Sequence, residues 1–526
     1  MAPSVVVSTL SKFPSWVPRS SAVVNGLILL TSFSTATVLG YDASMMNALN
    51  ILPSYTDYFS LSAATIGLNS GIVWIGAIFG SLALVKLPDH IGRKPAVFYS
   101  AVCAIVGSVL QGAAQNIAMF LVARFILGFG LGGTYVAGPL LIAETLPLKL
   151  RSYGLGAFTD LYYAGGLLSA GVTYGTAQMQ STWAWRLPSL LQIVFTLVSI
   201  MALPWIPESP RYLVHKGRQE DALRSIAQCC SNGDTTAPQA QATLLQIVQA
   251  WELERNFEEP SLKDIAKAPG LRKRMLIVLT VAAFSQLTGS GLFSYYLGSA
   301  LTNAGVTDST TQLEINIILN SFCLVVAIVG TFLAERMGRK LLAELSTAGC
   351  MIFLILIGVL TKYYGTSTNT SAIYATVAMI FLAQGSYSFA WTPLAVMYPP
   401  EILNYSLRSA GMAWFTIWQN ATLLVPIFAF PVAIESIGWI IYVLNGVFDF
   451  FVILVIVFSW VETKGLSLEE VSGLFEPQTG AALIGIDAAI QEARNEGVEV
   501  LEIMPNKAVR WPRDEAGDLV MNEKSV

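Results

Sequence analysis

Charge is what this sequence has least of. Only 12% of its 526 residues are charged and 54% are hydrophobic, whereas charged residues make up roughly 25% of a soluble domain. A surface so poor in charge would not stay in water, so the composition excludes a soluble globular protein and indicates an integral membrane protein. The net charge of −4 gives no bulk attraction to nucleic acid, and we expect no nucleic-acid partner.

Cysteine is also scarce, and the motifs of enzyme chemistry are missing. The five cysteines do not form a disulfide framework, and we expect reduced cytosolic thiols. The sequence shows no metal-ligand cluster, nucleotide loop or nucleophile–base arrangement. We therefore expect no metal and no cofactor, and an enzyme is the least expected class. The N-terminus lacks the apolar core and cleavage site of a signal peptide, so the first helix is expected to serve as an uncleaved signal anchor.

Long apolar runs fill most of the chain. A spanning helix needs about 20 mostly apolar residues, and we predict twelve of them in an all-α membrane fold. The predicted helices are 22–46, 66–86, 96–114, 118–141, 153–175, 187–206, 274–300, 314–334, 341–361, 372–397, 412–434 and 438–460. They divide the chain into an N-terminal tail (1–21), a six-helix bundle (22–206), a polar central loop (207–272), a second six-helix bundle (273–460) and a C-terminal tail (461–526).

The loop charges predict the orientation. Lysine and arginine gather in the loops on one side of the predicted helices, and Lys362 is the clear exception. Cytosolic loops carry the excess of basic residues, so both tails and the central loop are expected in the cytosol. Asn369-Thr370-Ser371 then lies outside the cell, and Asn369 is a candidate glycosylation site.

Several short charged motifs occur twice, in the same order, roughly half the chain apart. The repeats are Asp89-x-x-Gly92-Arg93-Lys94 with Glu335-x-x-Gly338-Arg339-Lys340, Glu144 and Arg151 with Glu401 and Arg408, and Glu208 with Glu462. This order indicates an internally duplicated protein. Duplicated membrane carriers place their substrate site between the two halves.

Two six-helix halves with a Gly-Arg-Lys turn after helices 2 and 8 resemble the major facilitator superfamily. Four segments (124–130, 185–188, 207–213 and 461–465) are similar to sugar porter motifs. Three more (40–42, 286–297 and 393–401) resemble the fungal lactose permease and cellodextrin transporter branch. The resemblance covers residues from about 22 to 476. It implies a monomeric carrier in the lipid bilayer of the plasma membrane, with a sugar and a proton as partners.

The repeated charged motifs are candidates for gating. Glycine permits a tight turn, and the basic pair can reach helix ends and carboxylates on neighbouring helices. We expect a network that holds the two halves together in the outward-open state and breaks on inward opening. Alternatively, these charges only keep the loops in the cytosol. The candidate gating residues are Asp89, Gly92, Arg93, Lys94, Glu144, Arg151, Glu208, Arg211, Glu335, Gly338, Arg339, Lys340, Glu401, Arg408 and Glu462.

Asp42 in helix 1 and Arg124 in helix 4 are candidates for proton coupling. Ionisable groups inside a membrane usually face the bundle interior, either paired or hydrated. A carboxylate near an arginine can change its proton occupancy as the site opens to one side or the other. The resemblance implies that Asp42 carries the proton and that Arg124 is its partner. The alternative is a structural ion pair in a uniporter.

The candidate substrate residues lie in helices 5, 7, 10 and 11. Amide and hydroxyl groups can bond sugar hydroxyls, and aromatic faces can stack on a pyranose; for each residue, ordinary helix packing is the alternative. The resemblance assigns a sugar-binding role to Gln286, whereas Ser290 and Ala395 depart from the polar residues usual in that branch. The candidates are Gln286, Asp160, Thr159, Ser290, Tyr295, Tyr296, Asn420 and Trp414.

Three functions remain open from the sequence. The first is a secondary active sugar transporter that works by alternating access and proton symport. The second is a carrier or exporter of a non-sugar metabolite from a fungal pathway, because the cavity is expected to be less polar than that of a disaccharide carrier. The third is a non-transporting sugar sensor.

Overall fold

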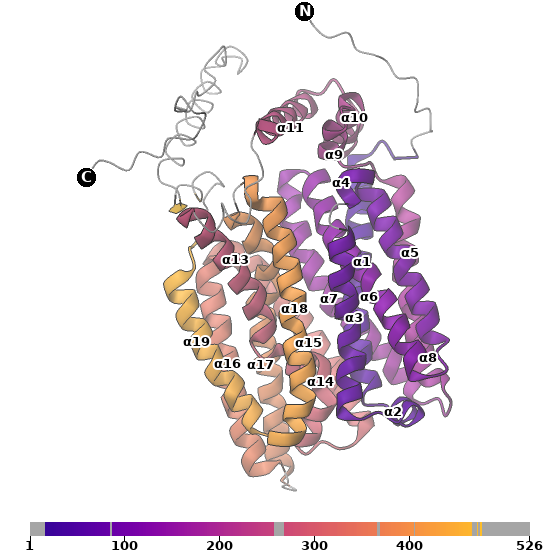
Figure 1. The fold of residues 1–526 in the computed structure, drawn as a ribbon, viewed down its shortest axis with the longest axis vertical. Coiled ribbons are helices and arrows are strands. Elements are labelled where there is room, and N and C mark those ends of the chain that lie inside the picture. The colour runs from indigo at the N-terminus through magenta and orange to yellow at the C-terminus, as the bar shows by residue number, and fades with distance from the viewer. Residues whose placement is uncertain are drawn as a thin grey trace, which may run out of the picture. The chain divides into compact units, whose positions relative to one another are not determined.

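Two six-helix bundles make up the membrane part of the computed structural model (Figure 1). The structure describes residues 16–84, 87–256, 268–365, 369–403, 405–464, 471 and 474–475. The chain divides into the units Met1–Gly465 and Leu466–Val526, and everything below concerns the first.

The twelve predicted spans are all present as helices, and the predicted fold class is confirmed. The N-terminal bundle contains α1 (Ser21–Leu49), α3 (Ala63–Leu84), α5 (Arg93–Gly112), α6 (Ile117–Thr145), α7 (Leu148–Ala177) and α8 (Trp183–Ala202). The C-terminal bundle contains α13 (Pro269–Leu287), α14 (Ser290–Asn303), α15 (Ser309–Met337), α16 (Arg339–Tyr364), α17 (Thr370–Ile402), α18 (Tyr405–Ile437) and α19 (Ile440–Ser459). Short α2 (Pro53–Phe59) and α4 (Leu87–Ile91) lie between spans.

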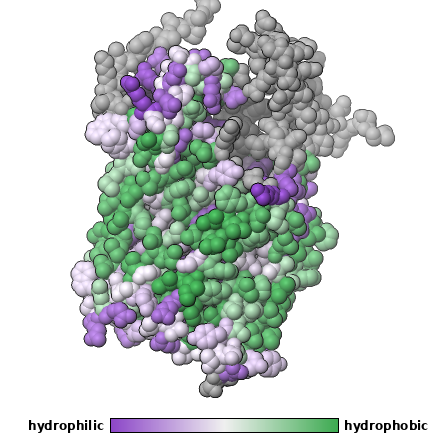
Figure 2. All heavy atoms as spheres, turned by 180° about the vertical axis from the view of Figure 1, so that it is seen from behind, coloured by the Kyte–Doolittle hydropathy of each residue, from purple (hydrophilic) through white to green (hydrophobic). Residues whose placement is uncertain are grey.

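Helix length and composition fit a bilayer. Eleven segments among the described residues are apolar enough and long enough to span it, with α13 and α14 taken together as one. Helix α7 is not among the eleven, because it is rich in glycine, serine, threonine and tyrosine. Figure 2 shows a broad apolar surface between more polar ends. Large apolar side chains such as Phe79, Val122 and Phe458 are exposed. A belt of this kind faces lipid.

The predicted seventh helix is broken. Helix α13 ends at Leu287 and α14 begins at Ser290, with Gly289 between them at φ 81° and ψ −9°. This left-handed conformation favours glycine. The side chain of Asn445 on α19 donates a 2.9 Å hydrogen bond to the carbonyl of Leu287. The break therefore leaves a backbone acceptor that a neighbouring helix satisfies.

The central polar segment contains more structure than the sequence predicted. Instead of a plain loop it forms α9 (Pro210–His215), α10 (Gln219–Cys230) and α11 (Pro238–Asn256), after a short 3-10 turn, η1 (Leu203–Trp205). The amide of Asn25 on α1 donates to the carbonyl of Cys229 at 3.0 Å, which ties this helical segment to the N-terminal bundle.

Candidate functional site

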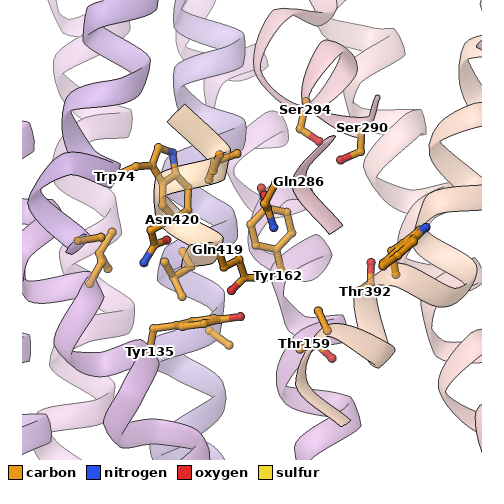
Figure 3. Close-up of a pocket in the computed structure, with 18 of the residues that line it drawn as sticks. Trp74, Tyr135, Thr159, Tyr162, Gln286, Ser290, Ser294, Thr392, Gln419 and Asn420 are labelled. Atoms are coloured by element: carbon orange, nitrogen blue, oxygen red, sulfur yellow. The ribbon is translucent and has the colours of Figure 1, made fainter. Parts of the chain in front are cut away.

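A cavity lies between the two bundles (Figure 3). Its walls come from α1, α3, α6 and α7 of the first bundle and from α13, α14, α17 and α18 of the second. Five of the eight candidate substrate residues line it: Thr159, Gln286, Ser290, Tyr295 and Asn420. This position agrees with the location expected for a duplicated carrier.

Asp42 and Arg124 form a buried ion pair inside the N-terminal bundle. The two guanidinium nitrogens Nη1 and Nη2 of Arg124 donate to the two carboxylate oxygens of Asp42 at 3.0 and 3.1 Å. Arg124 Nε also donates to the carbonyl of Asn69 at 2.7 Å. Asp42 is 2% exposed and Arg124 is 1% exposed. A buried pair of this quality is strongly coupled, because removing either charge leaves the other without compensation.

The amide groups of the cavity come from α13 and α18. Gln286 and Gln419 both direct their Nε2 atoms at Ser285 Oγ, at 3.2 and 3.5 Å. Asn420 forms no side-chain hydrogen bond with the part of the chain that the structure describes. Figure 3 shows these amides in the central part of the cavity, with Trp74 and Tyr135 beside them. The free amide groups can bond hydroxyl groups of a ligand.

Three candidate substrate residues lie outside the cavity lining, which corrects their expected placement. Asp160 accepts hydrogen bonds from Thr331 Oγ1 on α15 at 2.9 and 3.1 Å, and therefore joins the two bundles. Tyr296 donates to the carbonyl of Ile427 at 2.5 Å. Trp414 is 42% exposed. It shares a face of α18 with Trp418, four residues on, whereas Gln419 and Asn420 occupy the cavity face.

At the end of the N-terminal bundle where α5 begins, Arg93 binds Glu144 with two hydrogen bonds, of 2.7 and 2.9 Å. Glu208 accepts from the backbone N–H groups of Arg93, at 2.9 Å, and of Lys94. Burial raises the pKa of the Glu208 carboxyl, while these N–H groups and that of Ser209 oppose the rise.

The same arrangement recurs in the C-terminal bundle. Arg339 binds Glu401 at 2.8 and 3.1 Å, and Glu462 accepts from the backbone N–H groups of Arg339 and Lys340 at 2.9 and 3.0 Å. A hydroxyl reinforces the glutamate of each ion pair: Ser209 donates to Glu144, and Thr463 donates to Glu401. The internal duplication thus extends to individual hydrogen bonds.

The two ion pairs described above each lie within one bundle. Arg93 pairs with Glu144 in the first bundle, and Arg339 pairs with Glu401 in the second. The expected network between the two halves stays a prediction. Arg211 is exposed on α9, and Arg151 is half-buried at the start of α7. The side chains of Asp89, Glu335 and Arg408 lie outside the described part of the structure.

The two bundles meet at Asn47, near the C-terminal end of α1. Its Oδ1 accepts from the backbone N–H of Leu297 on α14 at 3.0 Å, and its Nδ2 donates to the carbonyl of Phe293 at 3.4 Å. Tyr296 has non-helical φ and ψ of −133° and 32°. A kink of this kind leaves the next N–H without its helical acceptor, and Asn47 supplies one.

The candidate glycosylation residue Asn369 is exposed at the start of α17. Its side chain caps that helix by accepting from the N–H of Ser371 at 3.1 Å.

Comparison with known proteins decides the family. A family described as "Sugar (and other) transporter" matches residues 27–475. The chain belongs to this family. A hexose transporter of Saccharomyces cerevisiae is 30% identical over 86% of the chain and 85% of the relative. The major myo-inositol transporter of Bacillus subtilis is 28% identical over 87% and 97%. The MFS-type transporter oryC of Aspergillus oryzae is 27% identical over 82% of each.

Solved structures agree on the fold. A proton:xylose symporter, XylE, bound to 6-bromo-6-deoxy-D-glucose, matches with a TM-score of 0.72 and 21% identity, over 87% of this chain and 100% of that one. The predicted membership of the major facilitator superfamily and its sugar porters is confirmed. The finer resemblance to lactose permeases and cellodextrin transporters stays a prediction, because the relatives named above are a hexose carrier, an inositol carrier and an MFS-type transporter.

Sequence reasoning missed several cavity residues. Trp74, Tyr135, Tyr162, Tyr163 and Tyr387 all line the cavity. An aromatic side chain in an apolar helix is typical of core or lipid-facing packing, so no pattern set Trp74, Tyr135 or Tyr387 apart. Tyr162 and Tyr163 lie two and three residues after Asp160, which was the one signal near them.

Proposed function

We propose that this protein is a secondary active transporter that moves a sugar across the plasma membrane by proton symport. The observation that carries the proposal is the conjunction of two features: a cavity between the bundles, lined by amides, and a buried Asp42–Arg124 pair in the wall-forming N-terminal bundle. The named functions of the relatives, hexose and inositol transport and proton:xylose symport, support it.

The ion pair provides a physical route to coupling. A proton on Asp42 removes the negative charge that compensates Arg124, and an uncompensated buried charge costs several kcal/mol. The protonated state therefore favours a rearrangement that hydrates or re-pairs the guanidinium. Because Asn47 lies five residues after Asp42 on the same helix, a movement of α1 reaches the contact with α14 near the outer ends.

The cytosolic networks serve this motion by keeping each bundle rigid. Ion pairs within one bundle persist while the bundles rock against each other, so each half moves as a body around the cavity. The positive loops orient both termini to the cytosol. Asn369 then carries a glycan outside, and the chain acts as a monomer in the bilayer.

Uptake measurements test the proposal. Labelled glucose, xylose, myo-inositol, lactose and cellobiose are offered to yeast that lacks its own hexose carriers, at acidic and at neutral pH. The comparison includes wild type, Asp42→Asn and, as a matched loss of an intramembrane acid, Asp449→Asn. Surface abundance is measured for each.

We expect uptake of at least one sugar, stronger at acidic pH, lost in Asp42→Asn and kept in Asp449→Asn. Exchange of labelled for unlabelled sugar across the membrane survives in Asp42→Asn, because exchange needs no net proton movement. Absence of uptake of every sugar by protein confirmed at the surface would overturn the sugar proposal. Uptake that is equal at both pH values and unchanged in Asp42→Asn would leave a uniporter.

A further inference from the structure

Aromatic rings form a large part of the cavity lining. Rings enter it from five helices, α3, α6, α7, α14 and α17. They belong to Trp74, Tyr135, Phe158, Tyr162, Tyr163, Tyr295, Tyr387 and Trp391.

The tyrosine hydroxyls are largely engaged within the protein. Tyr387 donates to the carbonyl of Ser285 at 2.7 Å, and Tyr163 is bonded to Ser388 at 2.7 Å. These residues therefore offer a ligand their ring faces and edges more than their hydroxyl groups.

Several small polar groups of the wall are engaged as well. Thr159 Oγ1 donates to the carbonyl of Gly156 at 2.7 Å, and Ser294 Oγ accepts from Gln384 at 3.1 Å. The polar groups left for a ligand are the amide groups of Gln286, Gln419 and Asn420 and the indole N–H of Trp74, which has no hydrogen-bond partner among the described residues.

The cavity lining thus combines ring faces with a small number of polar groups, and this limits which ligands can bind favourably. A hydroxyl that loses water and finds no partner costs about 1–3 kcal/mol, so a ligand with hydroxyl groups on every side fits poorly. A ligand with hydroxyls on one end and a flat apolar group on the other satisfies both parts. The amides bond the first end, and the rings pack on the second.

We propose that the cargo is an amphiphilic glycoside: a hydroxylated ring joined to an aromatic or similarly flat apolar group. This inference rests on the proposed sugar transport and narrows its substrate class. Trp74 is the ring best placed for a test, because it lines the cavity beside the amides in Figure 3 and packs edge-on against Tyr295, with ring centroids 6.3 Å apart.

The test is a binding titration of the purified full-length chain with three probes: phenyl β-D-glucopyranoside, D-glucose and phenol. We expect the glucoside to bind about tenfold more tightly than glucose, since each ring contact adds about a two- to tenfold factor. Trp74→Leu reduces this preference at least threefold, by the same reasoning. The matched control Trp418→Leu, a tryptophan 44% exposed on α18 and outside the cavity lining, leaves it unchanged.

The outcomes separate the two proposals. Glucose binding as tightly as the glucoside, in wild type and in Trp74→Leu, overturns the amphiphilic cargo and leaves sugar transport standing. Phenol binding as tightly as the glucoside, with no binding of glucose, overturns both, because the hydroxylated ring then contributes nothing. Failure of all three probes to bind a folded protein also counts against both.

Discussion

The two bundles of this protein match closely at the ends that carry the Gly-Arg-Lys turns and differ in their interiors. At the ends, Arg93 with Glu144 and Arg339 with Glu401 repeat almost atom for atom. Inside the membrane, the N-terminal bundle holds a charged pair, whereas the C-terminal bundle holds a broken helix and the buried acid Asp449. The elements that keep a bundle rigid are thus duplicated. The ion pair and the broken helix, in contrast, each occur in one bundle only, so the two halves contribute different elements.

The largest expected effect comes from disrupting the ion pair of the N-terminal bundle. Asp42→Leu leaves the Arg124 guanidinium buried at 1% exposure without its counter-charge. We expect a loss of about 3–5 kcal/mol in the free energy of unfolding, because an uncompensated buried charge is strongly destabilising. Thermal unfolding of the purified protein in detergent measures it.

The double variant Asp42→Leu/Arg124→Met serves as the control. It removes both charges and should recover most of the lost stability, since an apolar replacement of a whole buried pair is often neutral. Coupled uptake should stay absent. A single variant as stable as wild type would show that Arg124 is already hydrated or paired elsewhere.

A second prediction tests the duplicated ends. Gly92 has φ 106° and ψ 164°, and Gly338 has φ 98° and ψ 157°, a region that is essentially open to glycine alone. A Cβ atom would also lie 2.5 Å from Glu208 Oε2 at the first position and 2.6 Å from Glu462 Oε2 at the second. We expect Gly92→Ala and Gly338→Ala each to destabilise the protein by about 1–3 kcal/mol.

The informative readout is the similarity of the two glycine variants. Equal falls in thermal midpoint would support equivalent roles in the two halves. A loss of transport in only one variant, at unchanged stability, would contradict the view that both networks simply brace their own bundle.

Much of the fold was predictable because a bilayer restricts it strongly. Apolar runs of spanning length predicted twelve helices. The break at Gly289 in the seventh was found only in the structure. Helix ends were less accurate: α17 continues to Ile402, beyond the predicted 397, and its last turn is buried. The helices of the central segment were not predicted, since a polar sequence of this kind is typical of a loop.

Side-chain partners across helices were the least predictable part of the site. A helix that is apolar on all sides does not indicate which face meets lipid, so Trp414 was taken for a cavity residue although Asn420 lies on the face that lines the cavity. Asp160 was noticed for its charge, but nothing in the sequence indicated Thr331 as its partner. The repeated charged motifs were easier to recognise as structural elements, because the duplication supplies a second copy of each motif.

A third prediction concerns the contact between α1 of the N-terminal bundle and α14 of the C-terminal bundle. Asn47→Ala removes the acceptor of the Leu297 N–H and leaves that buried donor unsatisfied, at a cost of about 1–3 kcal/mol. We expect the α1–α14 contact to open more often, which raises cysteine labelling at the outer ends of the bundles and lowers coupled uptake. Asn50→Ala is the matched control, because the amide of Asn50 has no hydrogen-bond partner among the described residues. Equal labelling of the two variants would contradict a gating role for Asn47.

The smallest expected effect concerns the acid of the C-terminal bundle. Asp449 is 0% exposed, and neither carboxylate oxygen has a hydrogen-bond partner within the described part of the chain. Asp449→Leu therefore removes an unsatisfied polar group and should leave stability unchanged or raise it by up to about 1 kcal/mol. A destabilisation as large as that of Asp42→Leu would instead reveal a charged, partnered Asp449, and the two interiors would then be more alike than their contacts show.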